Sequence, residues 1–468
     1  MSAIVPPRGT TADPYSLSLS FSPHPNLHAP APPRFLWLLL AGFALASITS
    51  AKSPPALTTF MEDGGWCWYQ DPRAIISQGK LLVGGVSGQT GDVKVSVYDL
   101  VAEKDLGTVV LHPRFQVDDH DVPAFYTHPN GSMLAVYAKH SNERIHYYRI
   151  SEPDDYMQWG EEQQFVHDYD AKQGVTYMNL YHLKNEGLLY NFFRDGPTFN
   201  PSFITSADHG KTWGNRTHFI SDEVDGTHRP YARYLQRDAN TVGITFTDAH
   251  PRNFGNSLYD ADFRDGAFYR VDGSKIKDLA DGPLTTSEAE RVFQGSGIVT
   301  NATIDQSAPL SAWTSSAASD AMGNPHIGYT LYLDDDDDRY RLASWDDSQW
   351  HDREIAMGGK CLYPRESSYT GLVTIDPVDP RRIYISTDVH PTTGQDSGGT
   401  HEIYTAQVEL DDDIATIEWQ PLTTNSPDRN IRPIVAIGDG YRAVLWLSGP
   451  WRTYTDYESN VVGFIEKL

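Results

Sequence analysis

The stretch Ser206-Ala-Asp-His-Gly-Lys-Thr-Trp213 is the most informative segment for the fold. It fits the pattern S-x-D-x-G-x-T-W, the Asp-box, in which an aspartate binds the backbone of a β-hairpin turn and a tryptophan packs beneath it. Ser344-Trp-Asp-Asp-Ser-Gln-Trp350 is a degenerate copy. Asp-boxes occur at the outer turns of many β-propellers, so they indicate a fold and not an activity.

The segment 56–468 around these motifs shows almost no helical periodicity. Short runs of alternating apolar residues are interrupted every ten or so residues by Gly, Asp and Asn, which is typical of a β-sandwich, barrel or propeller. The segment is too long for one sandwich, but it suits seven blades of roughly 59 residues each. We therefore predict an all-β, seven-bladed β-propeller that forms a single catalytic domain.

Residues 1–55 differ in composition and are predicted to form a disordered leader with a signal peptide or signal anchor. The first part is rich in Pro, Ser and Ala, and such composition cannot bury a core. An uncharged apolar run, Phe35–Ser50, follows. It is shorter than the roughly 20 residues of a membrane span and ends in small residues, as signal peptides do. We expect a secreted, extracellular protein, with membrane contact only if this segment is retained as an anchor.

Three N-glycosylation sequons agree with secretion; they begin at Asn130, Asn215 and Asn301. The only two cysteines, Cys67 and Cys361, could form one disulfide in that compartment, but sequence alone leaves their pairing open.

The formal net charge is −25, from 37 basic and 62 acidic side chains. This argues against a nucleic-acid partner, because such proteins present a basic face. An anionic polysaccharide remains possible, because a few arginines in a cleft set the local field. The run Asp334–Asp338 could suggest calcium, but it lacks EF-hand spacing, and we favour a solvated acidic loop. We expect a monomer.

Two histidines, His120 and His140, flank a predicted β-hairpin. Its turn is Pro129-Asn130-Gly131. If the runs 122–126 and 133–138 pair, both imidazoles lie near one end of the sheet. Imidazole can take or give a proton near neutral pH, so this is a candidate site for proton transfer. The alternative is a pair of surface loop histidines.

Further candidates follow in later segments of the chain. Tyr177 and Arg194 stand at the ends of two predicted strands, Arg229 and Tyr231 lie in the block His228–Tyr234, and His250 lies in a polar loop. Arginine clamps carboxylates through a planar fork, and tyrosine can deliver a proton. Taken singly, Tyr177 and Tyr231 are better explained as packing aromatics, and the arginines as surface charges.

Seven blocks of sequence together resemble the BNR-repeat polysaccharide lyases, from about Gly64 to the C-terminus. The blocks are His-Asp-Val-Pro-Ala (120–124), Tyr-Ala-Lys-His (137–140), Thr-Tyr-Met-Asn-Leu-Tyr (176–181), Tyr-Asn-Phe-Phe-Arg (190–194), His-Arg-Pro-Tyr (228–231), Tyr-Thr-Gly (369–371) and Arg-Pro-Ile (432–434). That group includes ulvan lyases and fungal lyases acting on L-rhamnosyl-glucuronate ends of gum arabic and arabinogalactan.

The resemblance implies a site at one end of the propeller channel, a structural calcium or other metal with unknown ligands, and no organic cofactor. By motif, His120, His140 and Tyr177 match catalytic residues, and Arg194 and Arg229 match arginines that contact the uronate carboxylate. Tyr231 and His250 are further substrate-binding candidates.

The expected activity is β-elimination at glucuronate, by exo-type release of L-rhamnose from arabinogalactan or gum arabic. An endo-acting ulvan lyase is the alternative. Two other classes stay open: a sialidase-like hydrolase, which needs an arginine triad, and a propeller that only binds glycans.

Overall fold

The computed structural model describes residues 55–67, 69–170, 172–221, 229–300 and 308–468. Within these ranges the chain is all-β, with seven blades as predicted. The only helical elements described are three 3-10 turns, η1 (Asp119–Asp121), η2 (Leu279–Asp281) and η3 (Pro364–Glu366). The predicted leader and the sequon at Asn301 lie outside the described residues. None of the helices in the described ranges has the length and apolar character needed to cross a membrane.

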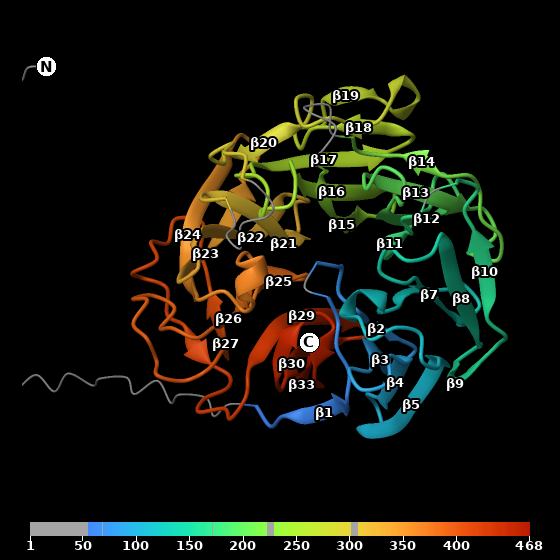
Figure 1. The fold of residues 1–468 in the computed structure, drawn as a ribbon, viewed down its shortest axis with the longest axis horizontal. Coiled ribbons are helices and arrows are strands. Elements are labelled where there is room, and N and C mark those ends of the chain that lie inside the picture. The colour runs from blue at the N-terminus through green and yellow to red at the C-terminus, as the bar shows by residue number, and fades with distance from the viewer. Residues whose placement is uncertain (1–54, 68, 171, 222–228, 301–307) are drawn as a thin grey trace, which may run out of the picture. The chain divides into compact units, whose positions relative to one another are not determined.

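The blades follow one another around a central axis (Figure 1). Blade 1 contains β2 (Ala74–Ser77), β3 (Lys80–Val86), β4 (Val93–Asp99) and β5 (Lys104–His112). Blade 2 contains β6 (Ala124–Thr127), β7 (Met133–Tyr137), β8 (Ile145–Glu152) and β10 (Gln163–Val166), with β9 (Asp155–Trp159) paired to β8. Blade 3 contains β11 (Thr176–Leu183), β12 (Leu188–Arg194), β13 (Pro201–Ser206) and β14 (Thr217–His218).

The next three blades repeat the pattern. Blade 4 contains β15 (Tyr231–Asp238), β16 (Thr241–Thr247), β17 (Leu258–Arg264), β18 (Ala267–Tyr269) and β19 (Lys275–Asp278), with β20 (Glu290–Phe293) paired to β17. Blade 5 contains β21 (Ser311–Ser319), β22 (Pro325–Asp334), β23 (Asp337–Trp345) and β24 (Trp350–Gly359). Blade 6 contains β25 (Val373–Asp376), β26 (Asp379–Thr387), β27 (Glu402–Gln407) and β28 (Gln420–Pro421).

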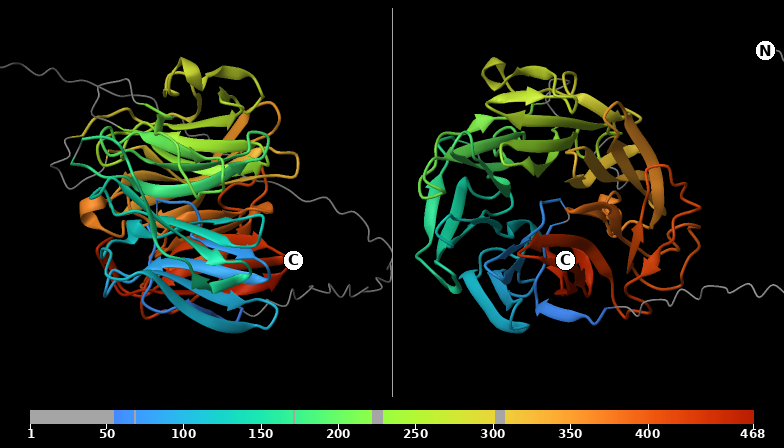
Figure 2. Two further views of the ribbon diagram at one scale, coloured as in Figure 1. Left: turned by 90° about the vertical axis from the view of Figure 1, so that its right-hand side faces the viewer. Right: turned by 180° about the vertical axis from the view of Figure 1, so that it is seen from behind.

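Blade 7 joins the two ends of the described chain. Its inner strands are β29 (Asn430–Gly438), β30 (Tyr441–Ser448) and β33 (Asn460–Lys467), and its outermost strand is β1 (Thr58–Met61). β1 pairs antiparallel with β33, with Thr58 opposite Gly463. Figures 1 and 2 show this strand beside the C-terminal strands. A small hairpin, β31 (Trp451–Thr453) and β32 (Asp456–Tyr457), extends from the β30–β33 connection.

Strand direction fixes which residues share an end of the propeller. The first strands of neighbouring blades contact one another around the centre, and each pairs antiparallel with its second strand. In blade 3, Thr176 at the start of β11 pairs with Arg194 at the end of β12. Segments before first strands and after second strands therefore share one end, which we call the channel face. The turn between third and fourth strands lies at the opposite end.

The Asp-box forms this opposite turn in blade 3. Asp208 accepts hydrogen bonds from the amide and the hydroxyl of Thr212, at 2.8 and 2.6 Å. Trp213 packs edge-on against Tyr148 of the neighbouring blade, with ring centroids 6.4 Å apart. In the degenerate copy, Asp346 likewise accepts backbone hydrogen bonds in the β23–β24 turn. Both motifs therefore occupy equivalent positions in their blades.

The structure bears on two points from the sequence, the possible disulfide and the acidic run. Cys67 and Cys361 are both free thiols, so no disulfide joins them. The acidic run turns between β22 and β23, and Asp334 and Asp336 are exposed as expected for a solvated loop. That expectation is wrong for Asp338, which is fully buried because it lies within β23 beside Gly358.

Candidate active site

The two candidate histidines meet at the channel face of blade 2. β6 and β7 form the predicted hairpin, with Ala124 opposite Val136. His120 lies in η1, just before β6, and His140 lies just after β7. Their imidazoles stack with centroids 3.8 Å apart and planes inclined by 12°. The sequence expectation that both imidazoles share one end of the sheet is confirmed.

Asp118 orients both imidazoles. Its Oδ1 lies 2.6 Å from Nδ1 of His120 and its Oδ2 lies 2.9 Å from Nδ1 of His140. The same Oδ1 accepts the backbone N–H of His120 and so caps η1. An ionised carboxylate only accepts hydrogen bonds, so each histidine donates through Nδ1. This assignment leaves the Nε2 atoms for other chemistry.

Burial and neighbouring charges drive the pKa values of the two histidines apart. Burial by itself lowers the pKa of His120, but Cys67 and the carboxylate of Asp118 raise it well above its ordinary value. Burial and the charge of His120 lower the pKa of His140 to about 4. Burial alone raises the pKa of Asp118, but the two histidines more than reverse this and lower it. Near neutral pH the pair therefore comprises a protonated His120 and a neutral His140, as an acid and a base require.

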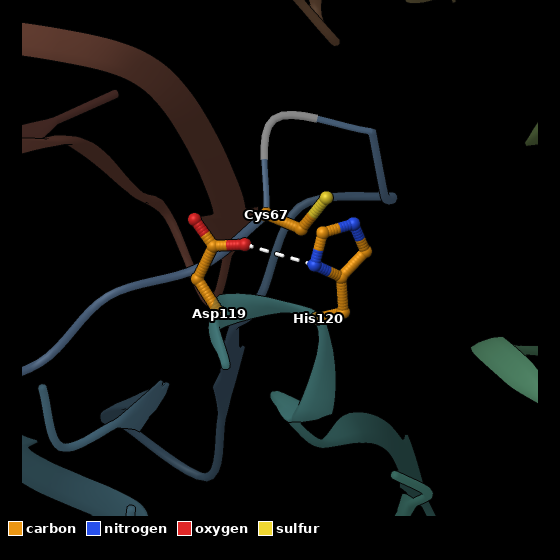
Figure 3. Close-up of side chains that lie close together, drawn as sticks. All are labelled: Cys67, Asp119 and His120. Carbon is orange, nitrogen blue, oxygen red and sulfur yellow. Dashed lines mark ion pairs between the residues drawn. The ribbon is translucent and has the colours of Figure 1, made fainter. Parts of the chain in front are cut away.

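The 3-10 turn that carries His120 is held by a buried ion pair. Oδ2 of Asp119 lies 2.7 Å from Arg432 Nη1 and accepts the indole N–H of Trp451 at 3.2 Å. Oδ1 of Asp119 lies 3.1 Å from Nδ1 of His120 (Figure 3). Arg432 has a left-handed φ of 57° and stacks over Trp451. The Arg-Pro-Ile block of the sequence thus positions the histidine turn.

Tyr177 and Arg194 stand beside the histidines, on the paired ends of β11 and β12. The guanidinium of Arg194 lies over the Tyr177 ring, 4.8 Å from its centroid, and that ring lies 5.4 Å from the ring of His120. Tyr177 has a left-handed φ of 64° within a bulged part of the strand, which turns its side chain out of the regular alternation. Burial raises the pKa of Tyr177, so the phenol keeps its proton.

Arg194 pairs only with neutral groups among the described residues. Its Nη2 donates to the hydroxyls of Ser141 and Thr176, at 2.6 and 3.5 Å, and its Nη1 donates to the hydroxyl of Tyr231 at 3.2 Å. Its Nε is buried and makes no hydrogen bond. A guanidinium without a carboxylate partner is suited to bind an anionic group of a ligand.

A cavity of about 380 Å³ opens beside Arg194. It is lined by Arg194, Phe199, Arg229, Tyr231, Ala249, His250, Arg252 and Asn253. Glu366 approaches both Arg252 and His250, the latter at 3.6 Å. Burial, Arg252 and Arg194 lower the pKa of His250 well below its ordinary value. Four sequence candidates, Arg194, Arg229, Tyr231 and His250, therefore share one positively charged cavity.

The fold brings together all seven candidate residues, and it adds some that sequence reasoning missed. Tyr454 lies edge-on to both histidines, at 5.2 Å from His120 and 5.7 Å from His140. Tyr69 and Trp313 pack against Tyr231. Asp118 was visible in the sequence two residues before His120. No local sequence pattern predicts that Tyr454, Tyr69 and Trp313 belong to the site, because each comes from a segment that is distant in sequence from the histidines.

Asp338 offers a place to test the calcium that the sequence resemblance implies. Both of its carboxylate oxygens are buried and make no hydrogen bond. Burial and the neighbouring carboxylates of Asp337, Asp335, Asp334 and Asp388 raise its pKa well above the ordinary value. Calcium binds carboxylate and carbonyl oxygens. Asp338 is therefore one candidate ligand on the channel face where the second strand β22 ends, but among the described residues no three side-chain ligands that include it lie within 4.8 Å of one another.

Comparisons with known proteins agree with this architecture. A family model described as "BNR repeat-containing family member" matches residues 67–357. The solved structure of polysaccharide lyase Uly1 superposes with a TM-score of 0.56 and 10% identity, covering 88% of this chain and 99% of that one. At this identity the likeness shows the fold alone.

Two other similar structures have lower scores. The NanB sialidase from Streptococcus pneumoniae gives a TM-score of 0.40 and 11% identity, covering 89% of this chain and 71% of that one. The β-propeller domain of the Trilobed protease from Pyrococcus furiosus gives 0.42 and 8%, covering 87% and 96%. No curated protein sequence matches the chain.

Proposed function

Because the chain belongs to the BNR repeat-containing family, we propose that it is a polysaccharide lyase that cleaves at glucuronic acid by β-elimination. One arrangement carries the proposal. A half-buried arginine whose described partners are all neutral hydroxyls stands beside two histidines that one carboxylate orients. This provides an anion site and a proton-transfer pair within one cluster.

His140 is the proposed base. Its side chain is 21% exposed, whereas that of His120 is 2% exposed, so His140 is the more accessible to a substrate. Its lowered pKa keeps it neutral at physiological pH. With Nδ1–H donated to Asp118, Nε2 is free to remove the C5 proton of a uronate.

The departing O4 must receive a proton as the bond breaks. Tyr177 and His120 are the two proposed donors, because the phenol stays protonated and the imidazole has a raised pKa. In glucuronate, H5 and O4 lie on the same face of the ring, so the base and the donor must approach from one side. Tyr177 and His120 both meet that requirement, because their rings lie 6.5 and 3.8 Å from the ring of His140.

Arg194 is the proposed partner of the uronate carboxylate, with Arg229 in the same cavity. Removal of the C5 proton delocalises negative charge onto the carboxylate. Fixed donors at this position stabilise that charge without having to reorganise, which is the largest electrostatic demand of the reaction. Tyr231 and His250 would complete the wall that holds the sugar.

The proposed substrate is a rhamnosyl-glucuronate end of arabinogalactan or gum arabic, with L-rhamnose as the released sugar. The β22–β23 turn and the loop 390–399 both follow second strands, so both rise on the channel face. Loops at that face can enclose the end of a chain and impose exo action. An ulvan-type polymer cut internally is the alternative.

We also propose a structural calcium ion, for which Asp338 is one candidate ligand, and secretion as a glycoprotein. The buried, unpartnered carboxylate supports the ion. Asn130 and Asn215 are exposed, as glycan acceptors must be.

One observation favours a second candidate, a sialidase-like hydrolase. Three arginines, Arg194, Arg229 and Arg252, line the same cavity, and a triad of this kind binds the carboxylate of a sialic acid. In that class a tyrosine acts as nucleophile with a glutamate partner. Here the hydroxyl of Tyr231 accepts from Arg194, and the oriented histidine pair has no role in that chemistry. We therefore prefer the lyase.

Incubation with gum arabic, with ulvan and with a sialoglycan separates these functions. A lyase generates the ultraviolet absorbance of a 4,5-unsaturated uronate, whereas a hydrolase or a glycan-binding propeller does not. We expect this absorbance with gum arabic, together with free rhamnose in the earliest samples. Free sialic acid without the absorbance would support the hydrolase and refute the lyase.

A further inference from the structure

A second set of side chains lies beside His120, and its carboxylate, Asp119, approaches the same Nδ1 that Asp118 binds. Cys67, Asp119 and His120 each present a ligand atom, and these atoms all lie within 4.8 Å of one another. All three residues are buried. Figure 3 shows the thiol of Cys67 and the carboxylate of Asp119 both close to the imidazole of His120. This is the one group in the described residues that combines a thiol, an imidazole and a carboxylate.

Asp119 gives independent evidence that the cluster is built for a ligand. Its Oδ2 is occupied by Arg432 and Trp451, but its Oδ1 is buried and makes no hydrogen bond. The side chain of Asp119 is 1% exposed. A buried carboxylate oxygen left without a hydrogen bond costs free energy unless something else satisfies it. The sulfur of Cys67 accepts the backbone N–H of Tyr69 at 3.3 Å, which holds it facing the cluster.

We propose that Cys67, Asp119 and His120 bind a zinc-like divalent cation, and that this cation inhibits the enzyme by occupying His120. Thiolate, imidazole and carboxylate are the three ligand types that zinc takes from proteins. Around zinc such atoms stand about 3.3 to 3.8 Å apart, given metal–ligand bonds of about 2.0 to 2.3 Å. The cluster must therefore close by at most about 1.5 Å, since none of these atoms are more than 4.8 Å apart.

Coordination changes the catalytic group chemically. The thiol of Cys67 and the imidazole of His120 must each lose a proton to bind the metal, and these protons pass to solvent. A metal-bound imidazole can neither donate a proton nor keep its hydrogen bond to Asp118 unchanged. The inhibition therefore rests on the proposed lyase function, whereas the metal binding does not.

A rival set, Asp118, His120 and His140, also lies within 4.8 Å. In that set both carboxylate oxygens already accept from the imidazoles, so a cation would have to displace two hydrogen bonds. In the Cys67 set, Oδ1 of Asp119 makes no hydrogen bond, and its ion pair, at 3.1 Å, is with His120 of the same set. A thiolate ligand also distinguishes the two sets experimentally.

Cobalt(II) is the probe, because a cobalt–thiolate bond gives an intense charge-transfer absorption that oxygen and nitrogen ligands do not give. We expect this band in the wild-type chain and in Cys361→Ser, and its loss in Cys67→Ser. Cys361 is the matched control because it is the only other cysteine. Wild-type protein that binds no cobalt, or binds it without the thiolate band, overturns the proposal even if Cys67→Ser fails to fold.

Zinc inhibition tests the second part of the proposal, that the bound cation inhibits the enzyme. The activity of each variant in the presence of zinc is compared with the activity of the same variant without zinc. The zinc concentration for half-inhibition should rise at least tenfold in Cys67→Ser and stay unchanged in Cys361→Ser. Equal sensitivity in both variants would assign inhibition to the Asp118 set and overturn this part of the proposal. If no lyase activity is found, the cobalt band still decides the metal site, so failure of the proposed function is recognised separately.

Discussion

Replacing Asp118 by asparagine probes the proton-transfer pair without removing either histidine. The carboxylate accepts from His120 at 2.6 Å and from His140 at 2.9 Å. An amide has one oxygen to accept with, so one imidazole loses its partner or turns to the wrong tautomer. Hydrogen bonds to a charged group contribute about 1.5 to 3 kcal/mol each. Loss of one such hydrogen bond corresponds to about one to two orders of magnitude in rate.

The assay is the initial rate of unsaturated-uronate formation, measured across pH, together with thermal unfolding. We expect kcat to fall by that factor, with the melting temperature lowered by only a few degrees. Asp208→Asn is the matched control, because Asp208 also accepts through both oxygens but lies in the Asp-box at the opposite face. It should lower stability and leave kcat unchanged. An Asp118→Asn variant with near-normal kcat would refute the acid–base account.

Three further predictions concern single groups. Arg194→Lys should lower kcat/KM by about ten- to a hundredfold, because a point charge cannot bind a carboxylate bidentately; steady-state kinetics with normal values would make Arg194 a structural residue. A profile of kcat/KM against pH should fall as the pH drops through about 4, where His140 becomes protonated, and fall again above the raised pKa of His120. A sharp loss of kcat/KM between pH 6 and 7 would contradict this. Burial and Arg216 lower the pKa of His167 to about 3 in the folded protein, whereas its pKa in the unfolded chain is about 6.5. As the pH drops from about 6.5 to 3, the unfolded chain takes up the proton first, so the free energy of unfolding falls. His167→Gln should therefore lose less melting temperature between pH 7 and 4.5 than wild type, whereas the same change at exposed His390 should not alter that loss.

The fold was largely predictable because local patterns and global architecture agree. The Asp-box predicts a turn that the structure places between the third and fourth strands of a blade, and the hairpin signal at Asn130 predicts the β6–β7 turn. Strand β16 is buried along its whole length although its sequence, Thr-Val-Gly-Ile-Thr-Phe-Thr, alternates. The alternation therefore indicates the strand but not the burial of both its faces.

The site was predictable where its residues stand at the ends of recognisable strands. Tyr177 and Arg194 were placed correctly because they flank one hairpin, and His120 and His140 because they flank another. Tyr454 and Cys67 could not be placed, since they reach the histidines from opposite ends of the chain through closure of the ring.

The burial of Asp338 could also not be predicted from the sequence. Five consecutive aspartates look alike in one dimension, and only the strand register turns one of them inward.

The central claim is cleavage by elimination, and the masses of the products test it most directly. A rhamnosyl-glucuronosyl oligosaccharide is incubated with wild type and with His140→Ala, and the products are analysed by mass spectrometry. Elimination predicts free rhamnose and an unsaturated acidic product whose masses sum to that of the substrate, with at least a hundredfold less of both in His140→Ala. Products that together weigh one water molecule more than the substrate would show hydrolysis and contradict the account.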